Sequence, residues 1–310
     1  MSLPTSIETR LSLPVIAAPM FLVSGPELVI AACRAGVIGA FPTANCRTTD
    51  ELDGWLARIA EACGEDAAPF APNLIVHRSN SRLQADLLTV CRYRPAMVIT
   101  SVGSPAPVVD AIHDAGGLVF ADVASMRHAE KALAAGADGL ILLTAGAGGQ
   151  TGWANPFAFV RGVRRIFDGP VVLAGGVADA RAVRAARVLG CDLAYMGTRF
   201  IATAESMADQ RYKRMIADAR LDDIALTKAI TGLETNMLIP SLLAAGLDPD
   251  NLPARGAIAI DEDINPDRPR RWKDVWSAGH TVEQVEDVPG VAELVTRLAA
   301  DYRTISSEGM

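Results

Sequence analysis

The sequence predicts an α/β protein that folds as a (β/α)8 TIM barrel with a small helical cap inserted after the eighth strand. Eight short apolar runs recur along the first two thirds of the chain, and segments of helix length separate most of them. The runs are continuously apolar instead of alternating, which is typical of parallel strands covered on both faces. Glycine follows several of the helical segments, where a left-handed residue ends a helix. These three observations favour repeated βαβ units.

The expected strands are short and follow one another at a regular spacing. They cover residues 15–18, 37–41, 70–75, 97–101, 118–121, 140–143, 171–174 and 193–196. The expected helices between them cover residues 49–62, 81–91, 106–115, 126–135, 156–167 and 179–189. With 310 residues, half of them hydrophobic, the chain can bury a core of the size that such a barrel needs.

The rhythm of strands and helices breaks after the eighth strand. Residues 205–273 contain a charged helical stretch, an apolar helix near 238–245 and a loop rich in proline and aspartate over 247–271. We expect residues 205–273 to form a helical region that caps the substrate. Residues 1–204 and 274–310 are then expected to form the cofactor-binding barrel, with a last helix over 291–302 that closes its outer ring.

The composition excludes several classes of function. A formal net charge of −7 and a pI near 5.2 argue against a protein that follows nucleic-acid phosphates. No apolar run approaches the about 20 residues that cross a bilayer, and the N-terminus shows no secretory signal, so we expect a cytoplasmic protein without a membrane partner. The five cysteines are odd in number and scattered, which fits reduced thiols.

Two neighbouring strand ends carry glycines where barrels commonly bind phosphate. Strand seven ends in Ala174, Gly175 and Gly176, and strand eight is followed by Gly197 and Thr198. We expect the cation of Arg199, the next residue, to lie beside the same position. Glycine lets backbone N–H groups approach an anion without a Cβ atom in the way. A tight turn is the alternative for the first pair, but the second glycine one strand further favours a phosphate site.

Other strand ends on the same face carry residues that suit a bound ligand. The sixth strand leads into a glycine-rich loop over 144–152, so the backbone there either passes close to a ligand or takes a strained conformation. The third strand contains Asn73, an amide that both donates and accepts hydrogen bonds. A dinucleotide-binding fold is disfavoured, because no GxGxxG follows the first strand, where residues 17–20 read AAPM.

Together these motifs resemble the nitronate monooxygenases, formerly called 2-nitropropane dioxygenases, which are FMN-dependent barrel enzymes. The similar stretches are residues 14–25, 72–73, 147–152, 174–179, 196–200 and 276–279. The resemblance implies that the isoalloxazine and ribityl parts of FMN contact Ala18, Pro19, Met20 and Asn73, and that Gly148 and Gly149 approach the ring system. It also implies that the phosphate is held by Ala174, Gly175, Gly176, Gly197 and Thr198.

Two positions depart from the family pattern and concern catalysis. Gln150 stands where the family usually has a histidine, which is thought to take the α-proton of a nitroalkane or to steer the substrate. Glutamine does not titrate near neutral pH and cannot act as a general base, whereas a nitronate is already deprotonated and needs none. His280 stands where the family more often has glutamine, and we hypothesise that its imidazole replaces the missing loop histidine. A solvated or structural histidine is the alternative.

A third departure lies at the end of strand five. Asp122 occupies a position where some relatives carry a lysine at the flavin edge, so the resemblance makes it a cofactor contact. An aspartate there can accept a hydrogen bond but cannot neutralise an anion.

The sequence therefore predicts an FMN-dependent oxidoreductase that oxidises alkyl nitronates with O2 to a carbonyl compound and nitrite. Two alternatives stay open: an NAD(P)H-dependent flavin reductase of an enoyl thioester or quinone, and a non-redox barrel lyase or isomerase that binds a substrate phosphate. The expected partners are a small-molecule substrate and O2 or NAD(P)H as redox partner. No metal ligands are expected, and the sequence is compatible with a homo-oligomer.

Overall fold

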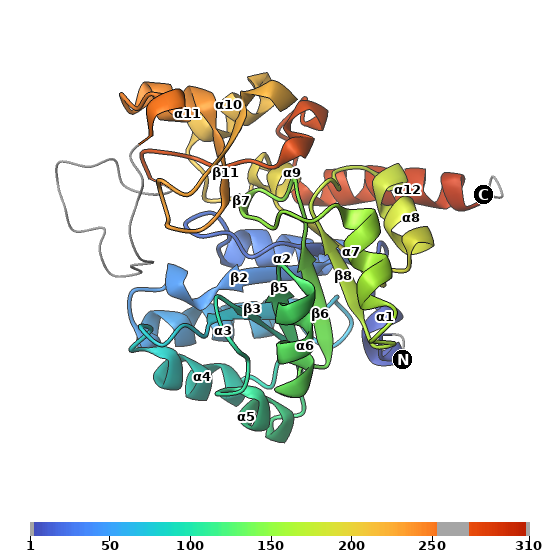
Figure 1. Cartoon of the computed structure of the whole chain (residues 1–310). Coiled ribbons are helices and arrows are strands. Elements are labelled where there is room, and N and C mark those ends of the chain that lie inside the picture. The colour runs from blue at the N-terminus through green and yellow to red at the C-terminus, as the bar shows by residue number, and fades with distance from the viewer. Residues whose placement is uncertain (1–2, 253–272, 308–310) are drawn as a thin grey trace.

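Eight parallel strands close into a barrel in the computed structural model, which describes residues 3–252 and 273–307 (Figure 1). The strands are β1 (Val15–Ala17), β2 (Ile38–Pro42), β3 (Phe70–Ile75), β4 (Met97–Ser101), β5 (Leu118–Val123), β6 (Gly139–Leu143), β8 (Val171–Ala174) and β9 (Leu193–Met196). Ile16 of β1 pairs with Ile38 on one side and with Tyr195 on the other, which closes the ring. All eight predicted strands are confirmed, with small differences at their ends.

Helices follow most of the strands and pack around the outside of the barrel. They are α2 (Pro26–Ala35), α3 (Thr49–Cys63), α4 (Leu83–Arg92), α5 (Val109–Asp114), α6 (Met126–Ala134), α7 (Pro156–Val163) and α8 (Ala180–Leu189). The sequence sets several of their ends: the side chains of Thr48 and Asp179 cap α3 and α8, and Gly36 ends α2 with a left-handed φ of 87°. The short helix α1 (Thr5–Glu8) places Ile7 in the cluster that fills the barrel interior.

The barrel strands are apolar throughout because both of their faces are covered. Along β6, Ile141 and Leu143 point into the barrel interior, whereas Leu140 and Leu142 pack under the outer helices. The same alternation runs through β5, where Phe120 faces inward and the next inward position is Asp122. Inward residues in the middle of the strands therefore belong to the core, whereas inward residues near the carboxyl ends line a site.

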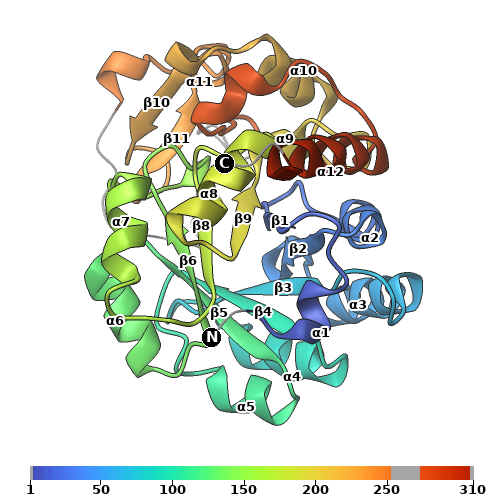
Figure 2. The same ribbon diagram turned by 90° about the vertical axis from the view of Figure 1, so that its right-hand side faces the viewer.

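The C-terminal helix α12 (Val291–Ser307) completes the outer ring, as predicted. It lies between α2 and α8 (Figure 2). Val291, Leu294 and Leu298 are buried in the same apolar cluster as residues of both helices. The chain thus uses its last segment to cover the strands β1 and β9, where the barrel closes.

The cap contains strands as well as the predicted helices. After α9 (Thr198–Ile201) come α10 (Gln210–Asp218), the 3-10 turn η2 (Leu221–Asp223), β10 (Ile224–Thr227), β11 (Thr235–Leu238), α11 (Ile239–Ala244) and the 3-10 turn η3 (Pro249–Asn251). Strand β11 pairs with β10 and also with β7 (Gly149–Gln150), a two-residue strand in the glycine-rich loop. The cap is therefore mixed instead of purely helical. Most of the loop predicted at 247–271 lies outside the described residues.

The segment after the cap packs against it. The rings of Trp276 and Tyr212 of α10 stack with centroids 5.0 Å apart. Val282, in the 3-10 turn η4 (His280–Gln284), is buried in the same cluster. Apolar side chains of this stretch, which we expect to belong to the barrel, share one buried cluster with Tyr212 and Ile216 of α10.

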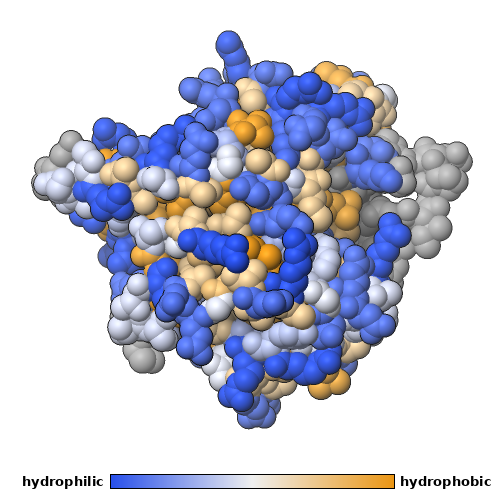
Figure 3. All heavy atoms as spheres, turned by 180° about the vertical axis from the view of Figure 1, so that it is seen from behind, coloured by the Kyte–Doolittle hydropathy of each residue, from blue (hydrophilic) through white to orange (hydrophobic). Residues whose placement is uncertain are grey.

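The outer surface carries no large unbroken apolar face in the view opposite to Figure 1. Figure 3 shows hydrophilic side chains over most of this face, with apolar atoms near its centre and charged side chains lying across them. One ion pair on the outer helices joins Arg58 of α3 to Glu27 of α2 at 2.8 Å. In residues 3–252 and 273–307, no helix is long and apolar enough to cross a membrane.

Candidate active site

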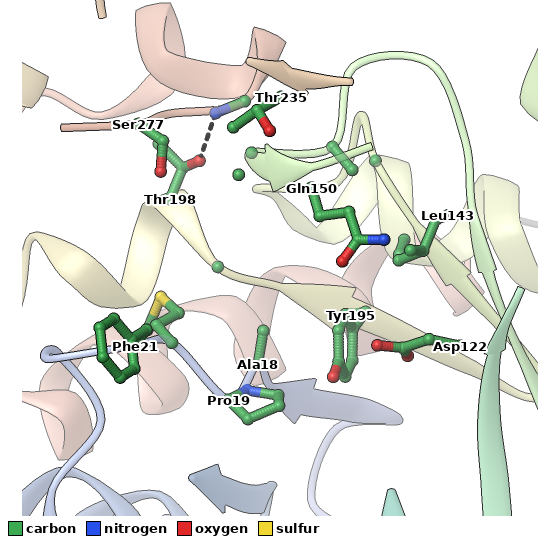
Figure 4. Close-up of a pocket in the computed structure, with 18 of the residues that line it drawn as sticks. Ala18, Pro19, Phe21, Asp122, Leu143, Gln150, Tyr195, Thr198, Thr235 and Ser277 are labelled. Carbon is green, nitrogen blue, oxygen red and sulfur yellow. Dashed lines mark hydrogen bonds between the residues drawn. The ribbon is translucent and has the colours of Figure 1, made fainter. Parts of the chain in front are cut away.

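A cavity of about 470 Å³ opens at the carboxyl ends of the barrel strands, under the cap. It is lined by every residue that the sequence analysis expects to contact the cofactor, and by Gln150. Those residues are Ala18, Pro19, Met20, Asn73, Asp122, Gly148, Gly149, Ala174, Gly175, Gly176, Gly197 and Thr198. Figure 4 shows how the labelled members converge from the ends of β1, β5, β7 and β9. The structure thus brings these residues to one place, which is the usual position of an active site in this fold.

The backbone favours glycine at two successive positions after β8. Gly175 has a φ of 113°, and a Cβ atom there would come within 2.6 Å of Thr144 Oγ1 and 2.9 Å of the Ala147 backbone nitrogen. Gly176 has a φ of 75°, but a Cβ atom there would meet nothing within 4 Å. Gly175 therefore serves the packing of the loop, whereas Gly176 keeps backbone open to the cavity.

The second half of this cradle comes from the end of β9. Thr198 begins α9, and its Oγ1 accepts a hydrogen bond of 2.8 Å from the backbone N–H of Gly279 (Figure 4). A Cβ atom on Gly148 would lie 2.7 Å from the nitrogen of the same Gly279. The glycine-rich loop and residues 278–279 therefore touch backbone to backbone beside Thr198.

The cation expected beside the cradle points elsewhere. Arg199 is 4% exposed and is not among the residues that line the cavity. Its guanidinium bonds the carboxylate and the backbone carbonyl of Asp287. The expectation that Arg199 lies beside the phosphate is wrong, because its side chain ties α9 to the segment that leads into α12.

Asp287 joins this buried arginine to the C-terminal helix. Its carboxylate also pairs with Arg297 of α12, whose Nη1 lies 3.0 Å from Asp287 Oδ2. Hydrogen bonds from Arg297 and the positive charges of Arg199 and Arg297 hold the pKa of Asp287 below its ordinary value of 3.8. The ionised carboxylate therefore stabilises the fold at neutral pH, and this contribution is lost as the pH falls through the lowered pKa.

Replacing Asp287 by alanine is expected to lower the free energy of unfolding by about 2 kcal/mol at pH 7, because Arg199 then stays buried without a carboxylate. The value is below that of a fully buried pair because Asp287 is 44% exposed. Urea unfolding at pH 7 and at about pH 3 measures it, and the difference from wild type should shrink at the lower pH. Glu27→Ala, which breaks the exposed pair with Arg58, is the control and should cost less than about 1 kcal/mol. Equal losses in both variants would contradict the role given to Asp287.

The glycine-rich loop is held in place by the cap. Gln150 pairs with Thr235 of β11, and the side-chain amide of Asn236 donates a hydrogen bond of 2.7 Å to the carbonyl of Ala147. The hydroxyl of Thr151 donates to the carbonyl of Thr144 at 2.9 Å, which closes the base of the loop. The side chain of Gln150 points from β7 into the cavity (Figure 4). Backbone pairing thus fixes the direction of a side chain that a free loop would leave undefined.

Polar side chains occupy the inward positions at the top of the barrel. Asn73 and Ser101, on the adjacent strands β3 and β4, bond each other at 3.2 Å. Asp122 Oδ1 and the hydroxyl of Tyr195 are buried and have no hydrogen-bond partner within the described residues. Burial raises the pKa of Asp122 to about 7, and burial together with the negative charge of Asp122 raises the pKa of Tyr195 well above its ordinary value. The floor of the cavity therefore carries unsatisfied polar groups.

The sequence profile of the nitronate monooxygenase family matches residues 80–301, which is more than half of the chain. The chain belongs to the nitronate monooxygenase family. It is 28% identical over 293 residues to the nitronate monooxygenase of Paraburkholderia phytofirmans, covering 80% of each chain. Enzymes of this family are flavin-dependent, so the chain is an oxidoreductase of that type.

Other similar proteins show how widely this barrel is used. A (3aS,4S,5R,7aS)-5-hydroxy-7a-methyl-1-oxo-octahydro-1H-indene-4-carboxyl-CoA dehydrogenase of Mycobacterium tuberculosis is also 28% identical, over 74% of this chain and 64% of its own length. The solved nitroalkane oxidase of Streptomyces ansochromogenes superposes with a TM-score of 0.84 at 24% identity, covering 97% of this chain and all of that one. FabK of Thermotoga maritima superposes with a TM-score of 0.79 at 22% identity, covering 98% and 96%. The two structures establish the shared fold.

The two departures from the family pattern that concern catalysis lie in different environments. Gln150 lines the cavity, half-buried. His280 is exposed and does not line the cavity, although its backbone N–H donates to the carbonyl of Gly146 at 2.9 Å. Its imidazole lies close to Gly146, because a Cβ atom there would come within 3.0 Å of Nδ1. The structure therefore does not bring His280 together with Gln150, and its catalytic role stays a hypothesis without geometric support.

Several polar residues of the cavity escape prediction from the sequence. They are Ser101, Tyr195, Tyr212, Thr235, Ser277 and Thr281. Tyr195 carries a readable signal, because a polar residue interrupts an apolar strand at the inward position two residues before Gly197. The residues of the cap and of the 277–281 segment reach the cavity through long-range packing, which leaves no local pattern.

Proposed function

We propose that this chain is an FMN-dependent oxidoreductase that oxidises alkyl nitronates with O2 to a carbonyl compound and nitrite. The observation that carries the proposal is the glycine cradle of β8 and β9, which opens into a cavity whose wall holds Gln150 in place of a titratable base. Membership of the nitronate monooxygenase family supports both the flavin and the chemistry.

The residues present fit a flavin mononucleotide. The open space at Gly176 admits a phosphate close to the backbone, and Gly197 and Thr198 lie on the neighbouring strand end. The β8 side of the cradle consists of loop backbone, because the first turn of α8 is already capped by the carboxylate of Asp179. The volume of about 470 Å³ lies within the range of small-molecule sites.

The cavity suits a substrate that needs no deprotonation. Among the described residues that line it, Asp122 is the one carboxylic acid, and there is no lysine, arginine or histidine. The amide N–H groups of Gln150 can donate to the oxygens of a nitronate and orient it, but they cannot take a proton from carbon. A bound flavin supplies the redox chemistry, and the protein positions the reactants and limits water.

The overall reaction balances without a further reductant. Two nitronate anions and one O2 give two carbonyl compounds and two nitrite ions. In each nitronate the C=N bond breaks, one oxygen atom joins the carbon, and nitrogen leaves as nitrite. The binding energy of the site is used to hold the substrate in a productive orientation.

A second candidate is an NAD(P)H-dependent flavin reductase of an enoyl thioester or quinone. It is favoured by the relative from Mycobacterium tuberculosis, whose name gives a carboxyl-CoA substrate and whose identity to this chain equals that of the nitronate monooxygenase. Exposed apolar side chains after the glycine-rich loop, Trp153 at 75% and Phe157 at 65%, would suit a long apolar substrate. The non-redox lyase or isomerase is set aside, because the chain belongs to a family of flavin-dependent oxidoreductases.

An anaerobic reduction experiment separates the two candidates. The protein is purified, loaded with FMN and mixed without O2 with an alkyl nitronate, NADH or NADPH while the flavin absorbance is recorded. We expect rapid bleaching by the nitronate and little by the nicotinamides, with nitrite formed once O2 is admitted. Bleaching by NADH or NADPH alone would support the reductase. A protein that neither carries nor takes up a flavin would contradict both.

A further inference from the structure

Two polar atoms in the floor of the cavity lack a partner. Asp122 Oδ1 and Tyr195 Oη are buried and unbonded within the described residues, and both residues line the cavity. A buried polar atom without a partner is costly, so native structures rarely keep two of them together. Their position in the cavity indicates that a bound ligand supplies the missing hydrogen-bond partners.

The two residues come from strands that are not neighbours. Asp122 follows Phe120 on the inward face of β5, and Tyr195 follows Leu193 on the inward face of β9. Figure 4 shows the carboxyl group of Asp122 directed toward the side of the cavity where the ring of Tyr195 lies. The nearby Asn73 and Ser101 differ from them, because those two side chains satisfy each other.

The surroundings favour the protonated form of Asp122 near neutral pH. Burial raises its pKa to about 7, and no cationic side chain of the described residues lines the cavity to lower it. The titratable group that faces it is Tyr195, whose own pKa is raised, while the neighbouring inward residues Ser101 and Leu143 do not titrate. Both groups can therefore present an O–H donor to a ligand.

We infer that Asp122 and Tyr195 form a donor pair that hydrogen-bonds an acceptor on the ring system of the bound flavin, and that the affinity for flavin follows the protonation of Asp122. This inference rests on the proposed FMN-dependent function. It adds Tyr195 to the residues of the flavin site. It also gives Asp122 the role of hydrogen-bond donor, whereas the sequence suggests an acceptor.

Binding of FMN to the flavin-free protein, measured from about pH 5.5 to 8.5 by quenching of flavin fluorescence, tests the inference. A ligand that binds the protonated carboxyl raises the pKa of Asp122 in the complex, so wild-type affinity is highest at low pH and falls as Asp122 ionises. We expect a fall of about tenfold between roughly pH 6.5 and 8.5, in addition to any change that FMN itself causes. Asp122→Asn keeps a neutral donor at every pH and should lose this additional fall.

Two further variants sharpen the comparison. Tyr195→Phe should weaken binding about threefold to tenfold at every pH and retain the pH dependence due to Asp122. Asp110→Asn removes the same charge from an exposed position on α5 and should follow the wild-type profile. Circular dichroism spectra of the variants establish that each one is folded.

Calorimetry of the wild type provides a readout that depends on no variant. FMN binding at about pH 7.5 in two buffers with different protonation enthalpies should reveal uptake of a fraction of a proton. Absence of uptake, or identical pH profiles for the wild type and Asp122→Asn, would overturn the inference while FMN binding itself still supports the proposed function. Failure of the wild type to bind FMN at any pH would overturn both.

Discussion

Replacing Gly176 by alanine is expected to weaken FMN binding by about a hundredfold while leaving the fold intact. A Cβ atom at this position meets no protein atom within 4 Å, so the methyl group would occupy the space that we propose for the phosphate. Loss of one charge-assisted backbone hydrogen bond to the phosphate, worth about 1.5–3 kcal/mol, accounts for an effect of this order. A fluorescence titration with FMN measures it.

The control for this prediction reproduces the backbone strain without touching the cavity. Gly116 has a φ of 85° in the turn before β5, at the opposite end of the barrel, and a Cβ atom there would meet only the Arg94 side chain, at 3.7 Å. Both alanine variants should lose about 1–2 kcal/mol of stability, because a residue with a Cβ atom is strained in the left-handed region. Gly176→Ala alone should bind FMN poorly, and it should discriminate less than wild type between FMN and riboflavin, which lacks the phosphate. Unchanged FMN affinity would mean that the phosphate lies elsewhere.

The strands can be predicted, and the phosphate cradle can be proposed, because each depends on a short stretch of local sequence. A parallel strand covered on both faces must be apolar throughout, so runs such as Val171–Ala174 are visible without any knowledge of their neighbours. Glycines at the ends of two such strands then locate the cradle, because the carboxyl ends of all barrel strands meet on one face.

The cap can be predicted only in part, because one of its strands pairs with residues that are far away in the sequence. The charged sequence of α10 indicates a helix, but β11 forms against Gly149 and Gln150, which lie much earlier in the chain. A four-residue strand paired with a two-residue strand has too few positions to show an alternating pattern. The sequence therefore does not show the small sheet, nor does it show that this sheet fixes the direction of the Gln150 side chain.

The direction of individual side chains is the other feature that the sequence does not predict. Arg199 follows Thr198 directly, yet one side chain supports the cradle and the other turns away to Asp287, 88 residues further along the chain. His280 likewise follows a segment that reaches the cavity but is itself exposed. Proximity in sequence to a ligand site does not determine which side chains enter it, because that choice depends on partners supplied by the rest of the fold.

Replacing Gln150 by histidine is expected to raise the oxidation of neutral nitroalkanes by about a hundredfold to a thousandfold. The proposed site oxidises nitronates because it lacks a base at this position, and a positioned general base contributes about 10²–10⁴-fold to a proton transfer. The pairing of β7 with β11 holds position 150 at the cavity, so an imidazole there is directed toward the substrate. The gain should grow as the pH rises through the pKa of the new histidine, because only the neutral imidazole accepts a proton.

Steady-state rates of nitrite formation from a nitroalkane and from its nitronate, measured side by side from about pH 5.5 to 8.5, check this expectation. Nitronate oxidation should change less than about threefold, since that substrate arrives without the α-proton. Gln150→Met, which has similar length but cannot titrate, separates the effect of a base from that of altered shape. If the methionine variant gained nitroalkane activity as much as the histidine variant, steric access and not proton transfer would limit the natural enzyme. If neither gained activity while nitronate turnover persisted, Asp122 would be the next group to test, because burial brings its pKa near neutrality in this cavity.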